Sequence, residues 1–455
     1  MHRQQLSYLS EWIKEKHRKP LVIRGGRQVG KSTLVRLLSE QCDLELVELN
    51  FERNPELVSL FKYNDPAKII QLVSLQTGQI IRPGYSLLFL DEVQAAAKAI
   101  VSLRYFYEEL PELHVIAAGS LLEFTLSQAA FSMPVGRIEY LHLGPMTFEE
   151  FLLAVGEAAL ADFLKHYQIN AEIPQPLHDK LMDLVRIYFI TGGMPESIKA
   201  YVEDRTFQAS EKAKQSILST YRDDFGKYAS FTKHDLIRQV FNKIPTLIGN
   251  KFKYSQISRE NKSVNIATAL NQLCLARVAW KVFHSAANGV PLGAEQNERF
   301  FKVLFLDIGL VSTSLGLNYL NLMKVNELDF INSGSLAEQF VGQHLLSSKK
   351  PYEEPSLYYW AREKKSSSAE LDYVISLDQQ IIPIEVKAGK TGQMKSLHLF
   401  LSEKQRDLAV RFNSAPPSQM DATTKLPNGV SVRFKFLSLP LYLVGQLCRL
   451  SNGLI

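Results

Sequence analysis

The chain has 455 residues, of which 46% are hydrophobic and 22% charged, and its formal net charge is +5 at pH 7. This length is too great for one ordinary hydrophobic core, so about two to four domains are expected. The composition excludes a disordered or low-complexity chain, and the small basic excess permits a nucleic-acid partner without arguing for one.

The cysteines and the N-terminus indicate the compartment. Cys42, Cys274 and Cys448 are scattered without a C-x-x-C spacing, which fits a reducing compartment and argues against a disulfide framework or a structural zinc site. The N-terminal 20 residues carry charge throughout, unlike a secretory signal, and no uncharged apolar run is long enough to cross a bilayer. A cytoplasmic protein with no membrane partner is expected.

The first predicted elements surround a glycine-rich loop. Residues 3–17 place apolar side chains at helical spacing and predict an amphipathic helix. The apolar run Leu21–Ile23 then predicts a short buried strand, and Leu34–Leu38 the beginning of a helix. Between them the sequence matches the G-x-x-x-x-G-K-[ST] phosphate loop, the other interpretation being a glycine turn with a chance Gly-Lys-Ser.

The chemistry of this loop follows from its residue types. Glycines allow several backbone N–H groups to converge on phosphate oxygens, and the following helix N-terminus adds partial positive charge. Lys31 is expected to reach the β/γ-phosphates of ATP, and the Ser32 hydroxyl to bind Mg²⁺. The predicted nucleotide-binding residues are Gly25, Gly26, Arg27, Gln28, Val29, Gly30, Lys31, Ser32 and Thr33.

Four further strands are predicted in this region, at residues 44–51, 86–92, 114–120 and 137–143. Short apolar strands that alternate with helical stretches are typical of a doubly wound parallel α/β sheet, which binds its ligand at the carboxyl ends of the strands. The fold class expected here is therefore that of a P-loop NTPase. The order of the strands in the sheet is not readable from the sequence.

Two carboxylates end the predicted strand at residues 86–92. Asp91 is expected to hold Mg²⁺ beside Ser32, and Glu92 to orient and deprotonate the attacking water. The alternative is a helix cap followed by a first-turn acid, and the phosphate loop upstream favours the catalytic interpretation.

Three single residues near the predicted strand ends have open roles. Ser120 would sense the γ-phosphate or cap a helix. Arg137 would stabilise the transition state or lie on the surface. Asn50 would hold Glu92 inactive until a partner binds, or form a turn.

The middle of the chain is predicted to be helical and then to change character. A helix is expected from Phe148, and Gly192–Glu196 interrupts the helical region. Residues 235–310 suggest a winged helix, with 254–257 and 265–274 as its two helices and 278–283 with 300–306 as wing strands. A three-helix structural module is the alternative, and the few basic residues on the second helix favour it.

The last third of the chain predicts a helix at Ser335–Leu346 and strands at 358–360, 370–377 and 380–388. The last two strands flank Asp378-Gln379-Gln380 and are expected to form a hairpin. Folding about Gln379 brings Asp372 opposite the stretch 385–387, and period-two alternation places Glu385 and Lys387 on one face.

Seven segments occur in an order that resembles one large family. They are GGRQVGKST, LLFLDEVQ, AAGSLL, VGRIEYLHLGPMTFEEFL, GGMPE, VLFLDIGL and IPIEVK. Nearly the whole chain is similar to the prokaryotic AAA-superfamily ATPases that carry a C-terminal domain of unknown function, and that domain resembles restriction-endonuclease-like nucleases. The resemblance implies ATP binding and hydrolysis and leaves the biological role open.

The C-terminal acids fit the nuclease resemblance. Asp372, Glu385 and Lys387, completed by Glu338 on the preceding helix, resemble a D…(D/E)-x-K nuclease core, in which a metal polarises the phosphodiester and the lysine positions water. Leu371 stands where nuclease motifs often have proline. An edge hairpin with alternating charges on its wet face is the other interpretation.

The prediction as a whole is a Mg²⁺-dependent ATPase coupled to a nuclease-like domain that acts on DNA or RNA. The expected domains are 1–155 (P-loop AAA-type ATPase), 156–234 (helical lid or linker), 235–329 (winged-helix-like) and 330–455 (nuclease-like). One alternative is an ATP-driven conformational switch that acts on a protein partner and carries an inactive nuclease-like fold. The other is a DNA-binding regulator that uses residues 235–310. The transition-state arginine is Arg137 or one from a neighbouring subunit, which leaves the oligomeric state open.

Overall fold

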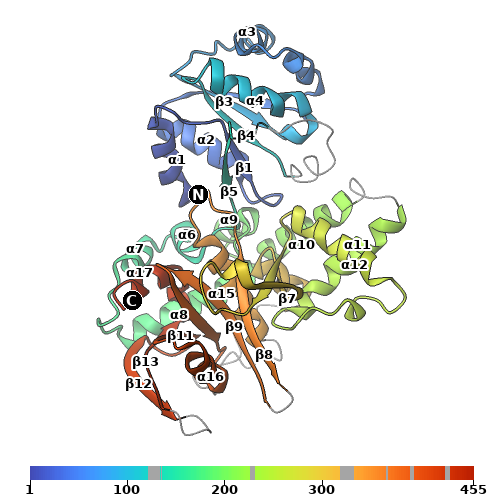
Figure 1. Ribbon diagram of the computed structural model, residues 1–455. Helices are drawn as coiled ribbons and strands as arrows, with labels where there is room; N and C mark the ends of the chain where they lie inside the picture. The colour runs from blue at the N-terminus through green and yellow to red at the C-terminus, as the bar shows by residue number, and fades with distance from the viewer. Residues whose placement is uncertain are drawn as a thin grey trace. The chain divides into compact units, whose positions relative to one another are not determined.

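The computed structural model describes residues 1–120, 134, 136–225, 231–317, 333–364, 367–389, 394–425 and 431–454 (Figure 1). The chain forms two compact units. Unit 1 comprises Met1–Gly144, Leu275–Val278 and Lys349–Glu354, and unit 2 comprises Pro145–Cys274, Ala279–Ser348 and Pro355–Ile455.

A five-stranded parallel sheet forms the centre of unit 1. Its order is β2-β3-β4-β1-β5, and every neighbouring pair is parallel. The strands are β1 (Leu21–Arg24), β2 (Glu45–Asn50), β3 (Ser86–Asp91), β4 (His114–Ala118) and β5 (Glu139–His142). The five predicted strands and the parallel α/β class are confirmed, and the carboxyl ends of β1, β3 and β4 adjoin at one edge.

Helices cover both faces of this sheet. Alternate strand residues such as Val22, Leu88 and Val115 share one buried core with α3 and α4, while α2 contacts β2, β3 and β4. Because successive side chains of a strand point to opposite faces, the intervening buried residues Leu21 and Phe89 serve the other face. The helices are α1 (Gln5–Lys14), α2 (Lys31–Gln41), α3 (Pro66–Thr77) and α4 (Ala97–Glu109), with 3-10 turns η1 (Pro55–Lys62) and η2 (Val93–Ala95).

Two short segments from later in the chain complete unit 1. The His142 backbone N–H at the end of β5 donates to the Pro351 carbonyl at 2.8 Å. The guanidinium of Arg277 pairs with the Glu354 carboxylate at 2.5 Å. The first 144 residues are therefore not the whole of this unit.

Unit 2 contains an eight-stranded mixed sheet of order β12-β13-β11-β10-β9-β8-β6-β7. In the β9–β10 hairpin Tyr373 pairs with Ile384 and Leu377 with Gln380, so the predicted hairpin is confirmed. The strands are β6 (Ala279–Ser285), β7 (Gln296–Phe305), β8 (Leu357–Lys364), β9 (Ser367–Leu377), β10 (Gln380–Val386), β11 (Leu408–Asn413), β12 (Ser418–Lys425) and β13 (Ser431–Pro440).

Two helices pack directly on this sheet. Helix α15 (Ser333–Ser347) contacts β7, β8 and β10, and α16 (Lys395–Lys404) contacts β9, β10, β11 and β13. Leu397 and Phe400 of α16 share a buried core with Trp360 of β8. This core closes the sheet on the side of α16.

The rest of unit 2 is mainly helical. Its helices are α6 (Phe148–Ala154), α7 (Ala158–His166), α8 (Gln175–Thr191), α9 (Pro195–Asp204), α10 (Phe207–Asp224), α11 (Phe231–Lys243), α12 (Ser263–Leu275), α13 (Ile308–Ser314) and α17 (Leu447–Ser451). Short 3-10 turns lie at η4 (Ile244–Leu247), η5 (Tyr254–Gln256), η6 (Leu292–Glu295) and η7 (Leu441–Gln446). Within the described ranges, no helix combines the length and apolar character needed to span a membrane.

The GGMPE and FLDIGL segments meet where α8 ends. Asp307 is fully buried, and its carboxylate accepts hydrogen bonds from the backbone N–H groups of Gly193 at 2.6 Å and Leu310 at 3.1 Å. Gly192 has a φ of +71°, and a Cβ there would lie 2.1 Å from Asp307 Oδ1 and 2.8 Å from the Gly309 Cα. The two segments therefore allow α8 and α13 to cross at close range.

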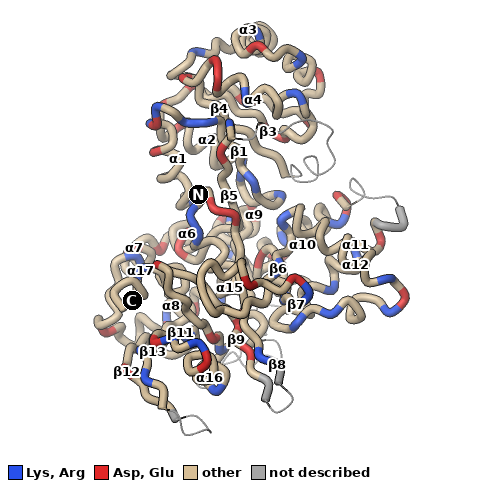
Figure 2. Tube along the Cα trace, in the orientation of Figure 1, with Lys and Arg blue, Asp and Glu red and all other residues tan. Residues whose placement is uncertain are grey.

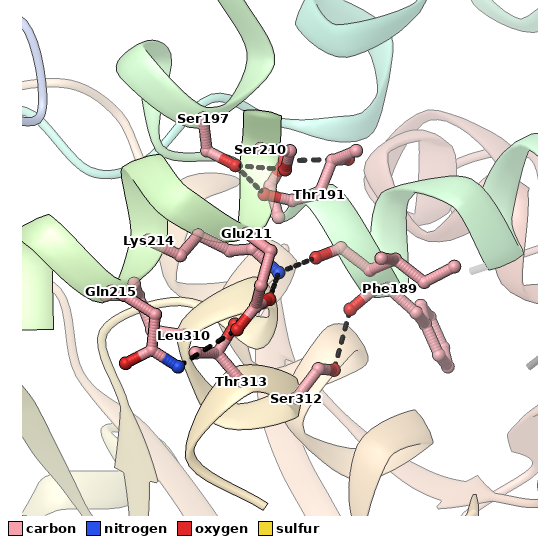
Figure 3. Close-up of polar contacts among 12 residues, drawn as sticks. Phe189, Thr191, Ser197, Ser210, Glu211, Lys214, Gln215, Leu310, Ser312 and Thr313 are labelled. Carbon is pink, nitrogen blue, oxygen red and sulfur yellow. Dashed lines mark hydrogen bonds and ion pairs between the residues drawn. The ribbon is translucent and has the colours of Figure 1, made fainter. Parts of the chain in front are cut away.

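A buried lysine joins the helices around this crossing, as Figure 3 shows. The ammonium of Lys214 on α10 donates to the Ile190 carbonyl of α8 at 2.6 Å and pairs with Glu211 at 2.9 Å. Thr313 of α13 donates to the same glutamate at 2.8 Å. Since every charged group here has partners within the fold, this network stabilises α8, α10 and α13 together.

The winged helix predicted at residues 235–310 is not confirmed. A helix and two strands do form where α12, β6 and β7 were expected, but η5 is a 3-10 turn at the place of the first predicted helix. Strand β6 also pairs in parallel with β8, so both predicted wing strands are part of the eight-stranded sheet. At 254–257, where the first helix of the pair was predicted, the structure has only the three-residue 3-10 helix Tyr254–Gln256.

Candidate functional site

The glycine-rich loop connects β1 to α2 and has the backbone geometry of an anion cradle. Gln28 and Gly30 have φ values of 62° and 95°, and Gly30 precedes α2 without a side-chain cap. A Cβ on Gly25 would lie 2.2 Å from the Leu143 carbonyl oxygen, so the loop fits against the end of β5 only with glycine there. The first N–H groups of α2 are left for a phosphate.

Lys31 begins α2 and points back over the loop. Its side chain is buried, and the ammonium donates to the carbonyl oxygens of Gly26 at 2.8 Å and Gly25 at 3.1 Å. Burial lowers the pKa of Lys31 to about 8, although the carboxylates of Glu92 and Asp91 act in the opposite direction. The loop thus holds a cation next to two acids.

Asp91 and Ser32 meet at the carboxyl edge of the sheet. The Ser32 hydroxyl donates to Asp91 Oδ2 at 3.1 Å, and the Asn50 amide donates to the same oxygen at 3.0 Å. Burial, followed by the charge of Glu92, raises the pKa of Asp91. A hydroxyl and a carboxylate are oxygen donors that Mg²⁺ prefers, so these two residues fit the predicted metal position.

Glu92 lies next in the chain, in the left-handed region with a φ of 52°. Its Oε2 accepts a hydrogen bond of 2.6 Å from the Gln94 side-chain amide. Asn50 instead contacts Asp91 and accepts a hydrogen bond from the Arg53 backbone N–H at 2.9 Å. The sequence interpretation missed Gln94, whose only signal was a polar residue two positions after the acid pair.

The remaining predicted residues of this site have different surroundings. Ser120 is 5% exposed just beyond β4, and its hydroxyl has no hydrogen-bond partner within the ranges the structure describes. Arg137 forms an exposed ion pair of 3.0 Å with Glu108 of α4. Arg27 lies 3.8 Å from Glu52, and Thr33 is exposed. The roles of Ser120 and Arg137 stay predictions.

The β9–β10 hairpin brings the C-terminal candidates together. Asp372 accepts a hydrogen bond from the Val386 backbone N–H at 2.7 Å, and Lys387 pairs with Glu385 at 2.5 Å. Burial, followed by the charge of Asp372, raises the pKa of Glu385 to about 7. Three of the four predicted residues therefore lie on one face of one hairpin.

The fourth, Glu338, joins them through a residue that the sequence interpretation missed. Lys302 of β7 lies 3.3 Å from Glu338, 2.7 Å from Glu370 and 3.6 Å from Asp372. A single lysine in the apolar run Phe300–Leu306 was the available signal. No group of three or more acidic, histidine or cysteine residues in the described part of the chain has the arrangement of a metal site. The predicted nuclease-like fold is not confirmed.

Three family models match the chain. Residues 17–152 match a model described as AAA domain. Residues 182–321 and 333–420 match models described as domains of unknown function, DUF8612 and DUF4143 respectively. None of the curated proteins matches the chain.

Several solved structures are similar over much of their length. The ORC2 protein of Aeropyrum pernix (ADPNP-ADP complexes) is 12% identical with a TM-score of 0.34, and the alignment covers 69% of this chain and 93% of that one. The ORC1 protein of the same organism in complex with DNA is 11% identical with a TM-score of 0.28, covering 71% and 95%. The RuvB Holliday junction branch migration motor of Thermotoga maritima is 13% identical with a TM-score of 0.26, covering 61% and 88%.

At these identities and TM-scores the solved structures say nothing about what this chain binds. The match of residues 17–152 and the parallel sheet with its phosphate loop agree with each other. The N-terminal part of the chain is an AAA-type P-loop ATPase domain.

Proposed function

We propose that unit 1 binds Mg²⁺-ATP and hydrolyses it by in-line attack of water on the γ-phosphate. The observation that carries this proposal is the contact of the loop with the acid pair, in which Ser32 donates to Asp91 at 3.1 Å. A chance glycine turn gives no reason for a helix-starting lysine buried over the loop beside two carboxylates.

Each residue has a separate task in this mechanism. Lys31 exchanges its contacts with the Gly25 and Gly26 carbonyls for the β/γ-phosphate oxygens. Ser32 and Asp91 would hold Mg²⁺, which neutralises phosphate charge when bound. Glu92 turns from Gln94 to the attacking water and accepts its proton. Arg137 or an arginine of a neighbouring subunit stabilises the transition state.

The test separates binding from turnover. The variant Glu92→Gln should bind ATP as the unchanged chain does and hydrolyse it at least about 100-fold more slowly, because it lacks the base. Lys31→Ala should weaken ATP binding itself. Fluorescent-nucleotide titration and phosphate release measure the two quantities.

Glu109→Gln is the matched control, since Glu109 is an exposed carboxylate on α4 of the same unit. It should change neither quantity. Hydrolysis that continues unchanged in Glu92→Gln would mean that another residue is the base.

The role of unit 2 follows from a separate consideration. Nucleic-acid cleavage by Asp372, Glu385, Lys387 and Glu338 stays a prediction, as does DNA binding by residues 235–310. Basic and acidic residues are interspersed along the drawn chain, which gives no particular support to a nucleic-acid face (Figure 2). Lys302 lies among the C-terminal acids, where a nuclease would bind its metal ion. This favours the alternative with an inactive nuclease-like fold, in which the chain is an ATP-driven conformational switch that acts on a protein partner.

A further inference from the structure

The side chain of Lys302 is enclosed by acids from two elements of unit 2. It is 4% exposed and comes from β7, whereas Glu338 comes from α15 and Glu370 and Asp372 come from β9. The ring of Tyr359 lies 5.6 Å from the ammonium. Burial by itself would lower the pKa of Lys302, but the charges of Glu338, Asp372 and Glu370 outweigh it and raise the pKa. The lysine is therefore charged at neutral pH.

A further carboxylate belongs to the same group. Glu385 is 6% exposed and faces Asp372 across the β9–β10 hairpin. Its Oε1 pairs with Lys387, but its Oε2 is buried without a hydrogen-bond partner among the residues described. Because a buried polar atom normally has a partner, Glu385 Oε2 is available to bind a cation other than Lys387.

We call Lys302, Glu338, Glu370, Asp372 and Glu385 the Lys302 cluster. The negative charges of its four acids explain why it needs a cation. Glu385 is buried and the other three carboxylates are partly buried, and such groups repel one another unless a positive charge lies among them. The carboxylate oxygens of Glu370, Glu338 and Asp372 lie 2.7, 3.3 and 3.6 Å from the Lys302 nitrogen. These are ion-pair distances, and with the lysine in place the described acids have no arrangement that would hold a metal.

We propose that the Lys302 ammonium occupies the cation position of this cluster, so that unit 2 holds these acids together without a divalent ion. Removing only this charge, at nearly constant side-chain volume, converts the cluster into a divalent-cation site. This inference is independent of ATP hydrolysis by unit 1. A cavity of about 160 Å³ is lined by Lys251, which lies 3.8 Å from Glu370, and by Tyr359, whose ring lies 5.6 Å from the Lys302 ammonium.

The experiment is a Mn²⁺ titration of the full chain, followed by the electron paramagnetic resonance signal of free Mn²⁺. All variants carry Asp91→Asn, which removes the predicted metal ligand of unit 1. The chain with Lys302 intact should bind no Mn²⁺ over the titrated range, and Lys302→Met should bind one ion. Adding Asp372→Asn to Lys302→Met should abolish that binding.

Lys387→Met is the matched control, because it removes the same charge beside Glu385 and leaves Lys302 in place. It should stay without metal. Circular dichroism establishes that each variant is folded. If Lys302→Met is too unstable to titrate, its melting temperature with and without excess Mn²⁺ is the readout, and a rise on addition of Mn²⁺ supports the proposal.

Two results would overturn the inference. One is Mn²⁺ binding by the chain with Lys302 intact, lost on Asp372→Asn, which would show a metal site that coexists with the lysine. The other is a folded Lys302→Met variant that neither binds Mn²⁺ nor melts at a higher temperature in its presence. Neither result depends on whether unit 1 hydrolyses ATP.

Discussion

Lys31 is a single residue whose environment sets the conditions under which the loop can bind a phosphate. Its ammonium is buried and held by two carbonyl oxygens of the loop. Burial lowers the pKa of Lys31 to about 8, against 10.5 for an ordinary lysine. Below pH 8 the loop therefore holds an ammonium, and above pH 8 it increasingly holds a neutral amine.

ATP affinity should accordingly fall as the pH rises through about 8. The loss should reach at most about tenfold per pH unit, because one proton must be taken up on binding. Isothermal titration of ATP between pH 7 and pH 9.5 measures it. Lys31→Met should bind ATP more weakly at every pH, and its affinity should not depend on pH in this range. Lys31→Arg keeps its charge over the whole range, so its ATP affinity should not depend on pH either. The same decline in both variants would exclude Lys31 as its source.

Other single residues show how far the sequence could go. Lys31, Ser32 and Asp91 were predictable because loop spacing and a strand end determine their position. Gln94 and Lys302 were not predictable. The contact of Gln94 with Glu92 depends on the local backbone conformation, and the acids that Lys302 contacts, Glu338 and Asp372, are distant in sequence. A lone lysine in an apolar strand predicts a buried partner but does not tell which one.

At the scale of elements, the crossing of α8 and α13 depends on the absence of side chains. Gly192 and Gly309 approach so closely that a Cβ on Gly309 would lie 2.6 Å from the Gly192 Cα. Asp307 fixes the crossing through the Gly193 and Leu310 backbone N–H groups. The two motifs were visible in the sequence, but only the fold shows that they contact each other.

The variant Gly192→Ala should destabilise unit 2 by about 3 kcal/mol or more, because it adds steric overlap to an unfavourable positive φ. Gly156→Ala is the matched control: its φ is +91°, but nothing lies within 4 Å of the added Cβ. That change should cost only about 1–2 kcal/mol. Urea unfolding compares them, and equal losses would show that the close crossing adds nothing beyond the backbone strain.

Local elements were predicted well, and their assembly was not. The β9–β10 hairpin was readable because its two strands flank one tight turn at Asp378 and Gln379. Strands β6 and β7 were placed correctly but assigned to a winged helix. The partner that decides their role, β8, begins at Leu357, far beyond any local pattern.

At the scale of the molecule, one sheet joins segments that the sequence suggested to be separate. The order β9-β8-β6-β7 places strands from both sides of residue 330 next to each other. The Lys302 cluster likewise takes its lysine from one side and its acids from the other. The division of the chain into four domains stays a prediction.

A shortened chain of residues 1–329 should therefore aggregate, because it leaves the β6 edge and Lys302 without their partners. Co-expression with residues 330–455 should restore solubility. Size-exclusion chromatography and thermal melting measure both. A monomeric 1–329 chain with a cooperative melting transition would show that the first strands form a stable fold alone.

The position of β8 in the sequence also matters while the protein is being made. Strands β6 and β7 leave the ribosome before the strand that will cover β6, which ends at Lys364. At about 5–20 residues per second, translation takes roughly 3–12 seconds to go from the end of β7 to the end of the missing strand. For that interval the nascent hairpin has an open edge, so a chaperone that shields extended backbone should associate with this protein during its synthesis.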